Sequence, residues 1–270
     1  MTTVSSTSRF GSHISSVTLD AAKRKAYERD GYVNIGTVLT RSGIELMQSE
    51  FKRVWEDGHK TYDPTVGPLQ DHLQYMPHLA APAAFLRWFY FNGPLVDVVD
   101  SLIGPNIKGV GSQLSNKQKR TALPVAWHQD NTYGELSPDN AISVIVPLVD
   151  IDEQNGCLWM IPGSHLEGLV PVPGKVTDEV KRTRGQFDLG VDDRRGVPLP
   201  MRAGEAVIFH ALTLHKSMHN HTDEDRLCLF MRYADADAVE VYNDGRPRIG
   251  KLLRGTSRFR EVVSAELTLD

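Results

Sequence analysis

The sequence predicts a mainly β protein, an antiparallel sandwich or barrel with helices packed on its outside. Short runs rich in apolar and β-branched residues begin near residue 107, and glycine-containing turns such as 155–156 and 203–204 separate them. No helical pattern alternates with these runs, which is typical of antiparallel β architectures and not of parallel α/β folds. The expected strands lie at about 107–117, 141–149, 157–161, 197–201, 205–210 and 226–233.

Helical patterns collect in the N-terminal part of the chain. Residues 1–16 are rich in Ser and Thr, so we expect this segment to be flexible. Thr18 has the character of a helix N-cap, and Gly31 is suited to end the helix that follows. The expected elements are a helix over 19–30, a strand over 32–35, a helix over 42–55 and a helical region over 83–102 that is broken at 92–94.

Composition narrows the class of protein. A chain of 270 residues with 40% hydrophobic and 24% charged residues can bury one core, and we expect one domain over 1–270. The net charge of -4 gives no electrostatic support to a nucleic-acid partner. The N-terminus lacks the apolar core of a signal peptide, and the longest apolar run, 141–149, is too short to span a bilayer. We therefore expect a cytoplasmic protein with no nucleic-acid or membrane partner; the sequence does not define its oligomeric state.

Two cysteines occur, Cys157 and Cys228, each inside an apolar segment. Two are too few for a disulfide scaffold. We expect both to be buried free thiols in a reducing compartment.

A histidine and a carboxylate lie two residues apart in the segment 124–130. On an extended strand, residues i and i+2 point to the same face, so His128 and Asp130 can converge on one ion. This pair alone is a weak signal. Downstream, an apolar strand ends near His215, and Arg226 follows eleven residues later at the start of another strand.

Two histidines and one carboxylate suit iron(II) because they occupy three adjacent corners and leave positions open for a 2-oxo acid and dioxygen. A buried arginine supplies the planar fork that grips a distal carboxylate. The same ligands also suit zinc, so a zinc hydrolase stays open, as does a barrel that binds metal without turnover. Arg226 argues against the hydrolase, which needs no carboxylate clamp. His210 competes with His215 as ligand, and we favour His215 because Ser217 and Arg226 accompany it; on one strand the odd spacing would put His210 on the opposite face.

These pieces resemble the phytanoyl-CoA dioxygenase family of iron(II)- and 2-oxoglutarate-dependent oxygenases. The likeness is carried by three segments, 127–130 (WHQD), 155–165 (NGCLWMIPGSH) and 204–226, with a weaker match at 30–33. It extends over about residues 25–235, the expected core. The resemblance implies a double-stranded β-helix of the jelly-roll or cupin type, flanked by α-helices from the N-terminal half.

The resemblance also implies roles for individual residues. His128, Asp130 and His215 would be the catalytic iron ligands. Other residues would contact the cosubstrate 2-oxoglutarate: Arg226 at its C5 carboxylate, helped by Ser217, with Gln113 and Ser143 as further polar contacts. The reaction would be an oxidative decarboxylation of 2-oxoglutarate by O2, coupled most simply to hydroxylation of an unactivated carbon.

The outcome and the substrate are less constrained by the resemblance. Related halogenases replace the carboxylate ligand by a small residue, so Asp130 argues against halogenation, whereas desaturation, epoxidation and cyclisation stay open. We prefer a small-molecule biosynthetic intermediate over an acyl-CoA thioester as substrate. Two long connections, 56–82 and 166–196, are either lids or variable surface insertions. With the residues after Asp130, they supply the candidate substrate contacts His72, Met76, Tyr133 and Arg184.

Overall fold

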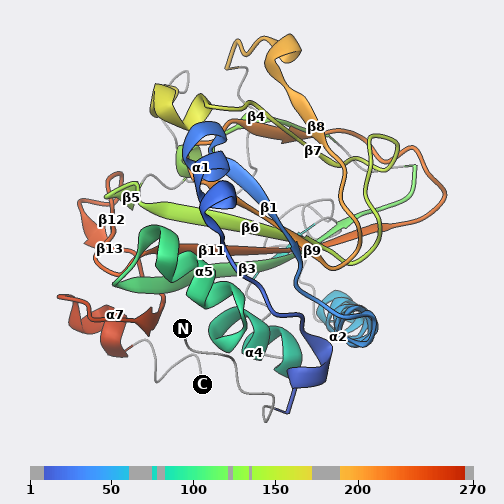
Figure 1. Ribbon diagram of the computed structural model, residues 1–270, viewed down its shortest axis with the longest axis horizontal. Helices are drawn as coiled ribbons and strands as arrows, with labels where there is room; N and C mark the ends of the chain where they lie inside the picture. The colour runs from blue at the N-terminus through green and yellow to red at the C-terminus, as the bar shows by residue number, and fades with distance from the viewer. Residues whose placement is uncertain are drawn as a thin grey trace.

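The structure is a computed structural model, and its central feature is a pair of antiparallel sheets that face each other (Figure 1). The larger sheet has seven strands in the order β1-β9-β6-β11-β3-β14, with β2 paired to β3. The structure describes residues 9–60, 75–77, 83–120, 124–133, 136–171 and 189–264. The strands of the larger sheet are β1 (Tyr32–Thr37), β2 (Tyr75–Pro77), β3 (Ile107–Lys117), β6 (Ala141–Pro147), β9 (Glu205–His210), β11 (Arg226–Asp235) and β14 (Lys251–Arg254).

The smaller sheet has four strands in the order β4-β10-β7-β8, and a third, short sheet has the order β13-β12-β5. The four strands are β4 (Val125–His128), β7 (Leu158–Met160), β8 (Val197–Leu199) and β10 (His215–Ser217). The short sheet consists of β5 (Leu136–Ser137), β12 (Val239–Glu240) and β13 (Arg246–Pro247).

Apolar side chains fill the space between the two main sheets. Ile145, Val207 and Phe209 of the larger sheet pack with Leu158 and Met160 of the smaller sheet in one buried cluster. Alternation along each strand sends every second residue to this inner face and the others to the outer face. The antiparallel sandwich that the sequence predicts is therefore present.

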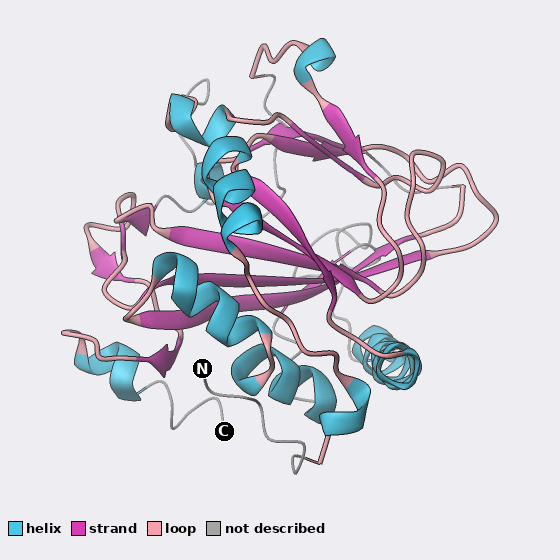
Figure 2. Cartoon of the chain, in the orientation of Figure 1, coloured by secondary structure: helices cyan, strands magenta, loops and turns pink. Residues whose placement is uncertain are grey.

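Helices cover the outer face of the larger sheet (Figure 2). Val144 and Leu229 on that face pack in one buried cluster with Phe89 of α4 and Val99 of α5. The helices are α1 (Ala21–Asp30), α2 (Arg41–Lys60), α4 (Ala84–Asn92), α5 (Leu95–Ile103) and α7 (Arg260–Ser264). Four 3-10 turns complete the described elements: η1 (Gly11–His13), η2 (Asp130–Tyr133), η3 (Ser164–Glu167) and η4 (Asp193–Arg195).

Most expected helices occur close to their predicted bounds. The break at 92–94 separates α4 from α5, and Gly31 ends α1 with a φ of 79°. The expected N-cap Thr18 is wrong, because Asp20 accepts a hydrogen bond from the backbone N–H of Lys23 and so caps α1. Both cysteines are buried and unbridged. In the part of the chain that the structure describes, no helix combines the length and apolar character needed to cross a bilayer.

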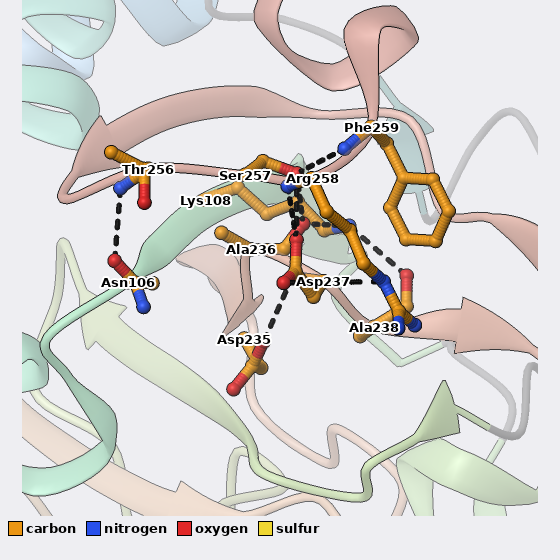
Figure 3. Close-up of polar contacts among 10 residues, drawn as sticks. All are labelled: Asn106, Lys108, Asp235, Ala236, Asp237, Ala238, Thr256, Ser257, Arg258 and Phe259. Atoms are coloured by element: carbon orange, nitrogen blue, oxygen red, sulfur yellow. Dashed lines mark hydrogen bonds and ion pairs between the residues drawn. The ribbon is translucent and has the colours of Figure 1, made fainter.

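The chain after β11 is tied to the end of the larger sheet by a buried lysine (Figure 3). The Lys108 amine donates hydrogen bonds to the carbonyls of Ala236 and Ala238, at 3.0 and 3.1 Å. Burial lowers the pKa of Lys108 to about 8. The carboxylate of Asp237 accepts from the Ser257 hydroxyl at 2.8 Å, which holds the segment that follows β14. These hydrogen bonds hold the C-terminal part of the chain against the end of the larger sheet.

Candidate metal centre

Three side chains that can bind a metal meet on the inner side of the smaller sheet. His128 ends β4 and lies directly opposite His215, the first residue of β10, in the antiparallel pairing of these strands. Asp130 begins the η2 turn. One potential ligand atom from each residue lies within 4.8 Å of the others. Oδ1 of Asp130 is 3.9 Å from Nε2 of His128 and 3.7 Å from Nε2 of His215, too far for direct hydrogen bonds but suited to a shared ion.

The path of the chain to this cluster differs from the expectation. The sequence argument placed His128 and Asp130 on one face of a single strand, but β4 ends at His128 and Asp130 belongs to a 3-10 turn. The turn, and not strand alternation, brings the carboxylate back towards the two imidazoles. The prediction that both residues lie on one strand was therefore wrong, although the two side chains do converge.

Backbone carbonyls fix both imidazole rings. Nδ1 of His128 lies 2.9 Å from the carbonyl oxygen of Ala126, and Nδ1 of His215 lies 2.9 Å from that of Thr213. A carbonyl oxygen only accepts, so Nδ1 carries the proton in each ring. Each Nε2 then presents a lone pair towards Asp130, the arrangement that metal-binding histidines use.

Asp130 stays ionised at neutral pH. Burial acts to raise its pKa, but His215, Arg232, His128 and the hydroxyl of Ser143 outweigh burial and lower the pKa to about 2. The Ser143 hydroxyl donates to Oδ2, which leaves Oδ1 facing the histidines. Ser143 was expected to contact 2-oxoglutarate, and the structure gives its hydroxyl this different partner.

Solvent reaches the cluster from the side of the carboxylate. The Asp130 side chain keeps 26% of its exposure, against 14% for His128 and 4% for His215. A ligand would therefore approach past Asp130 and not through the smaller sheet.

His210 lies outside this cluster. It ends β9 in the larger sheet, whereas His215 begins β10 in the smaller sheet, so the two are not on one strand as the sequence argument assumed. Nδ1 of His210 accepts from the backbone N–H of Leu212 at 3.1 Å, and its ring lies 5.6 Å from that of His165. These are the contacts of a packed, hydrogen-bonded histidine.

A second group of polar side chains lines the inner face of β3 and β11. Arg226 pairs with Lys117 in the strand register, and the next inner-face pair is Cys228 with Ser115. Arg226 is 1% exposed, and its Nε has no hydrogen-bond partner in the described part of the chain; Nη1 reaches only the Cys228 sulfur, at 3.4 Å. The Ser115 hydroxyl is equally buried and unsatisfied there.

Buried donors without partners are rare in folded proteins and costly, so this group fits an oxyanion ligand. Lys117 adds a further cation, is 0% exposed, and has its pKa lowered to about 7 by burial and by Arg226. Ser217, 4% exposed on β10, is also buried. These donors suit the distal carboxylate of 2-oxoglutarate, with the metal cluster further along the same interior.

Sequence reasoning selected Gln113 from the inner face of β3 and gave no role to Ser115 or Lys117. All three alternate on one face, and Gln113 lies opposite Phe230 in the register. The signal that could have found the other two is this alternation combined with their pairing to Arg226 and Cys228. That pairing is set by the fold and cannot be read along the sequence.

The expected substrate contacts are only partly covered by the structure. His72 and Arg184 lie outside the described residues, as do the side chains of Met76 and Tyr133. The backbone of Met76 pairs with Leu114, next to Gln113 on β3, and Tyr133 is the last residue of η2. Their role in substrate binding stays a prediction.

Known proteins share both the sequence pattern and the fold. Residues 27–228 match the family model of phytanoyl-CoA dioxygenase (PhyH). The peroxisomal phytanoyl-CoA dioxygenase of Rattus norvegicus is 27% identical over 252 residues, which cover 83% of this chain and 70% of that protein. Among solved structures, the α-ketoglutarate-dependent carbocyclase SnoK from nogalamycin biosynthesis aligns with a TM-score of 0.68 at 23% identity, covering 87% of this chain and 95% of that one.

A further solved relative contains the cofactors themselves. The epimerase SnoN, in complex with Fe3+, α-ketoglutarate and nogalamycin RO, aligns with a TM-score of 0.63 at 23% identity, covering 84% of this chain and 86% of that one. These structures confirm the double-stranded β-helix. The region matched by the family model runs from α1 into β11, so it includes the histidine–aspartate cluster as well as the arginine beside Lys117. The chain belongs to the phytanoyl-CoA dioxygenase family and is an iron(II)- and 2-oxoglutarate-dependent dioxygenase.

Proposed function

We propose that the protein hydroxylates an unactivated carbon of a small molecule, with iron(II) held by His128, Asp130 and His215. The observation that carries the proposal is the pair of imidazoles whose Nδ1 protons are tied to backbone carbonyls and whose Nε2 atoms face an ionised carboxylate. Arg226 supports it independently, because a buried guanidinium with an unsatisfied Nε requires an acceptor that the described protein does not supply.

Each residue has a definite task in this reaction. When bound, iron and 2-oxoglutarate would activate O2: one oxygen atom would enter succinate as 2-oxoglutarate loses CO2, and the other would enter the substrate as a hydroxyl group. Asp130 contributes one negative charge that Ser143 keeps in position. Arg226 orients the cosubstrate through its distal carboxylate, with Ser217 and Gln113 beside it. Burial of Arg226 keeps water from competing for this contact.

The related proteins support the choice of cofactors but leave the outcome of the reaction open. SnoK is described as a carbocyclase and SnoN as an epimerase, so the same fold supports outcomes other than hydroxylation. An acyl-CoA hydroxylase is the second candidate, favoured by the name of the rat relative. We prefer a biosynthetic small molecule, acted on in the cytoplasm.

Succinate formation tests the proposal. Metal-free protein is supplied with iron(II), zinc or manganese together with 2-oxoglutarate and ascorbate, and succinate is measured with and without O2. We expect succinate only with iron(II) and O2. Succinate formation independent of 2-oxoglutarate, or hydrolytic activity restored by zinc, would contradict the proposal.

A further inference from the structure

A second arginine lies on the same face of β11 as Arg226. Arg232 pairs in the register with Ser143 of β6, the residue whose hydroxyl holds Asp130. Arg232 lies six positions after Arg226 along the strand, which places their Cα atoms roughly 20 Å apart. Arg226 therefore lies at one end of the inner face, and Arg232 lies beside the metal cluster at the other. Arg232 is also beyond residues 27–228, the region that the family model matches.

The contacts of Arg232 leave hydrogen-bond donors unused. Its Nη2 donates to Oδ1 of Asn131 at 2.6 Å, and its Nε has no partner among the described residues. Because a guanidinium only donates, the Asn131 atom that faces it must be the oxygen, which assigns the other atom as the NH2 group. This Nδ2 is also buried, since Asn131 is 1% exposed, and it has no hydrogen-bond partner among the described residues. Two neighbouring side chains thus offer donors to an acceptor that the described chain does not provide.

The charges near Arg232 also leave room for an anion. Burial lowers the pKa of Arg232, and the carboxylate that raises it again is Asp130, which in the proposed function is committed to the metal. Arg248 is a second cation near Arg232, and its own charge is paired with Glu240 at 2.6 Å. With iron bound, Arg232 therefore has no carboxylate of its own in the described part of the chain.

Arg232 as a whole residue is nevertheless only partly buried. It is half-buried, in contrast to the fully buried Arg226, and Asp130 beside it is the most exposed of the three metal-binding residues. A partly buried cation with a buried, unused donor, flanked by an unsatisfied amide, has the composition of an anion-binding site.

We propose that Arg232 and Asn131 bind an anionic oxygen group of the substrate, a carboxylate or a phosphoryl group, and so hold the substrate against the metal cluster. The proposal rests on the proposed function, since it takes Asp130 as an iron ligand. Arg226 binds the cosubstrate at the far end of the face, so the two arginines recognise different molecules. The substrate class is then an acidic small molecule.

Binding of simple acids tests the assignment without knowledge of the full substrate. Protein loaded with manganese(II) and 2-oxoglutarate is titrated calorimetrically with hexanoate, benzoate and hydrocinnamate. Each acid is compared with its primary amide, which has the same shape without the charge, and with the matching phosphonate. We expect the best acid to bind at least about tenfold more tightly than its amide, the effect of one charge-assisted hydrogen bond. The ratio of phosphonate to carboxylate affinity distinguishes the two anion types.

Variants separate substrate binding from a purely structural role. Arg232→Met should abolish the preference for acid over amide while leaving 2-oxoglutarate affinity within about threefold of wild type, and Arg232→Lys should retain part of the preference because the charge stays but the fork is lost. Asn131→Asp, nearly isosteric, supplies an internal carboxylate to Arg232 and should also abolish it. The control is Arg202→Met, an exposed arginine paired with Asp150, which should change nothing.

Each outcome decides one claim. Equal or undetectable binding of acids and amides to wild type overturns the anion site, as does an acid preference that survives in Arg232→Met. Loss of 2-oxoglutarate or metal binding in Arg232→Met would instead make Arg232 a support for Asp130 and would also overturn it. If wild type itself fails to bind 2-oxoglutarate with the metal, the proposed function fails first, and this inference fails with it.

Discussion

Replacement of Arg226 by leucine gives the most discriminating prediction, because it should act in opposite directions on ligand binding and on stability. Arg226 is 1% exposed, and its Nε is unsatisfied in the described part of the ligand-free protein. Loss of one partner of a buried charge pair costs about 2–5 kcal/mol. Ser115, Ser217 and Lys117 would remain near the carboxylate, so we expect the lower part of that range, roughly a 30- to 150-fold weaker affinity for 2-oxoglutarate.

The stability of the ligand-free protein should not fall in parallel. Arg226→Leu removes a buried charge that lacks a carboxylate partner in the described chain, so the free energy of unfolding should stay equal or rise. Affinity is measured by anaerobic titration of 2-oxoglutarate into the iron(II) protein, and stability by urea unfolding without ligand. Arg226→Lys is the matched control. Its affinity for 2-oxoglutarate should lie between those of wild type and Arg226→Leu, because it keeps the charge but loses the bidentate fork.

Two results would contradict the proposed role of Arg226. Affinity within about threefold of wild type would remove Arg226 from the cosubstrate site. A large loss of stability in the ligand-free protein would show that Arg226 is held by groups of the protein itself and is not waiting for a ligand.

Other predictions address the metal cluster and the pH dependence. Asp130→Ala should abolish succinate formation with an unchanged circular dichroism spectrum, and retained turnover would contradict the assignment of Asp130 as an iron ligand. His210→Ala should keep stoichiometric iron by metal analysis, since its ring contacts His165 and not the cluster; iron loss would reverse the choice between the two histidines. Ser143→Ala should weaken iron affinity roughly 10- to 100-fold in chelator competition, because the hydroxyl that holds Oδ2 of Asp130 is lost. The pKa of Lys117 is lowered from 10.5 to about 7, so between these pH values the unfolded chain binds more protons than the folded protein, and the free energy of unfolding should rise with pH. Urea unfolding at a series of pH values measures this rise, and Lys117→Met should flatten it. An identical slope in the variant would contradict a buried amine at this position.

Local patterns predicted the elements of this fold well. Short apolar and β-branched runs bounded by turn residues predicted the strands β6, β9 and β11, because burial between a second sheet and a layer of helices makes both faces of a strand apolar. Short strands at the metal cluster were harder to predict. β4 and β10 have four and three residues, too few for periodicity to register, and their pairing brings together segments far apart in the chain.

The residues of the candidate site were predictable from the sequence, but their arrangement was not. His128, Asp130 and His215 could be proposed from the sequence because residue type, spacing and family resemblance all bear on them. Their geometry could not, since a 3-10 turn delivers Asp130 and the change of sheet between residues 210 and 215 separates the two candidate histidines.

The amino-acid sequence alone was sufficient to predict the strands that build the sandwich and the resemblance to a known family, which implied the metal and the cosubstrate. These predictions depend on residue identity, on short-range pattern and on resemblance to a known family. The three-dimensional structure was needed to identify the other polar residues that face the interior. Ser115 and Lys117 become candidate ligand contacts because the register of β3 against β11 places them near Arg226. Arg232 becomes a candidate because β6 places Ser143 opposite it. Register between distant strands is set by the packing of the whole sheet, so no local stretch of sequence records it.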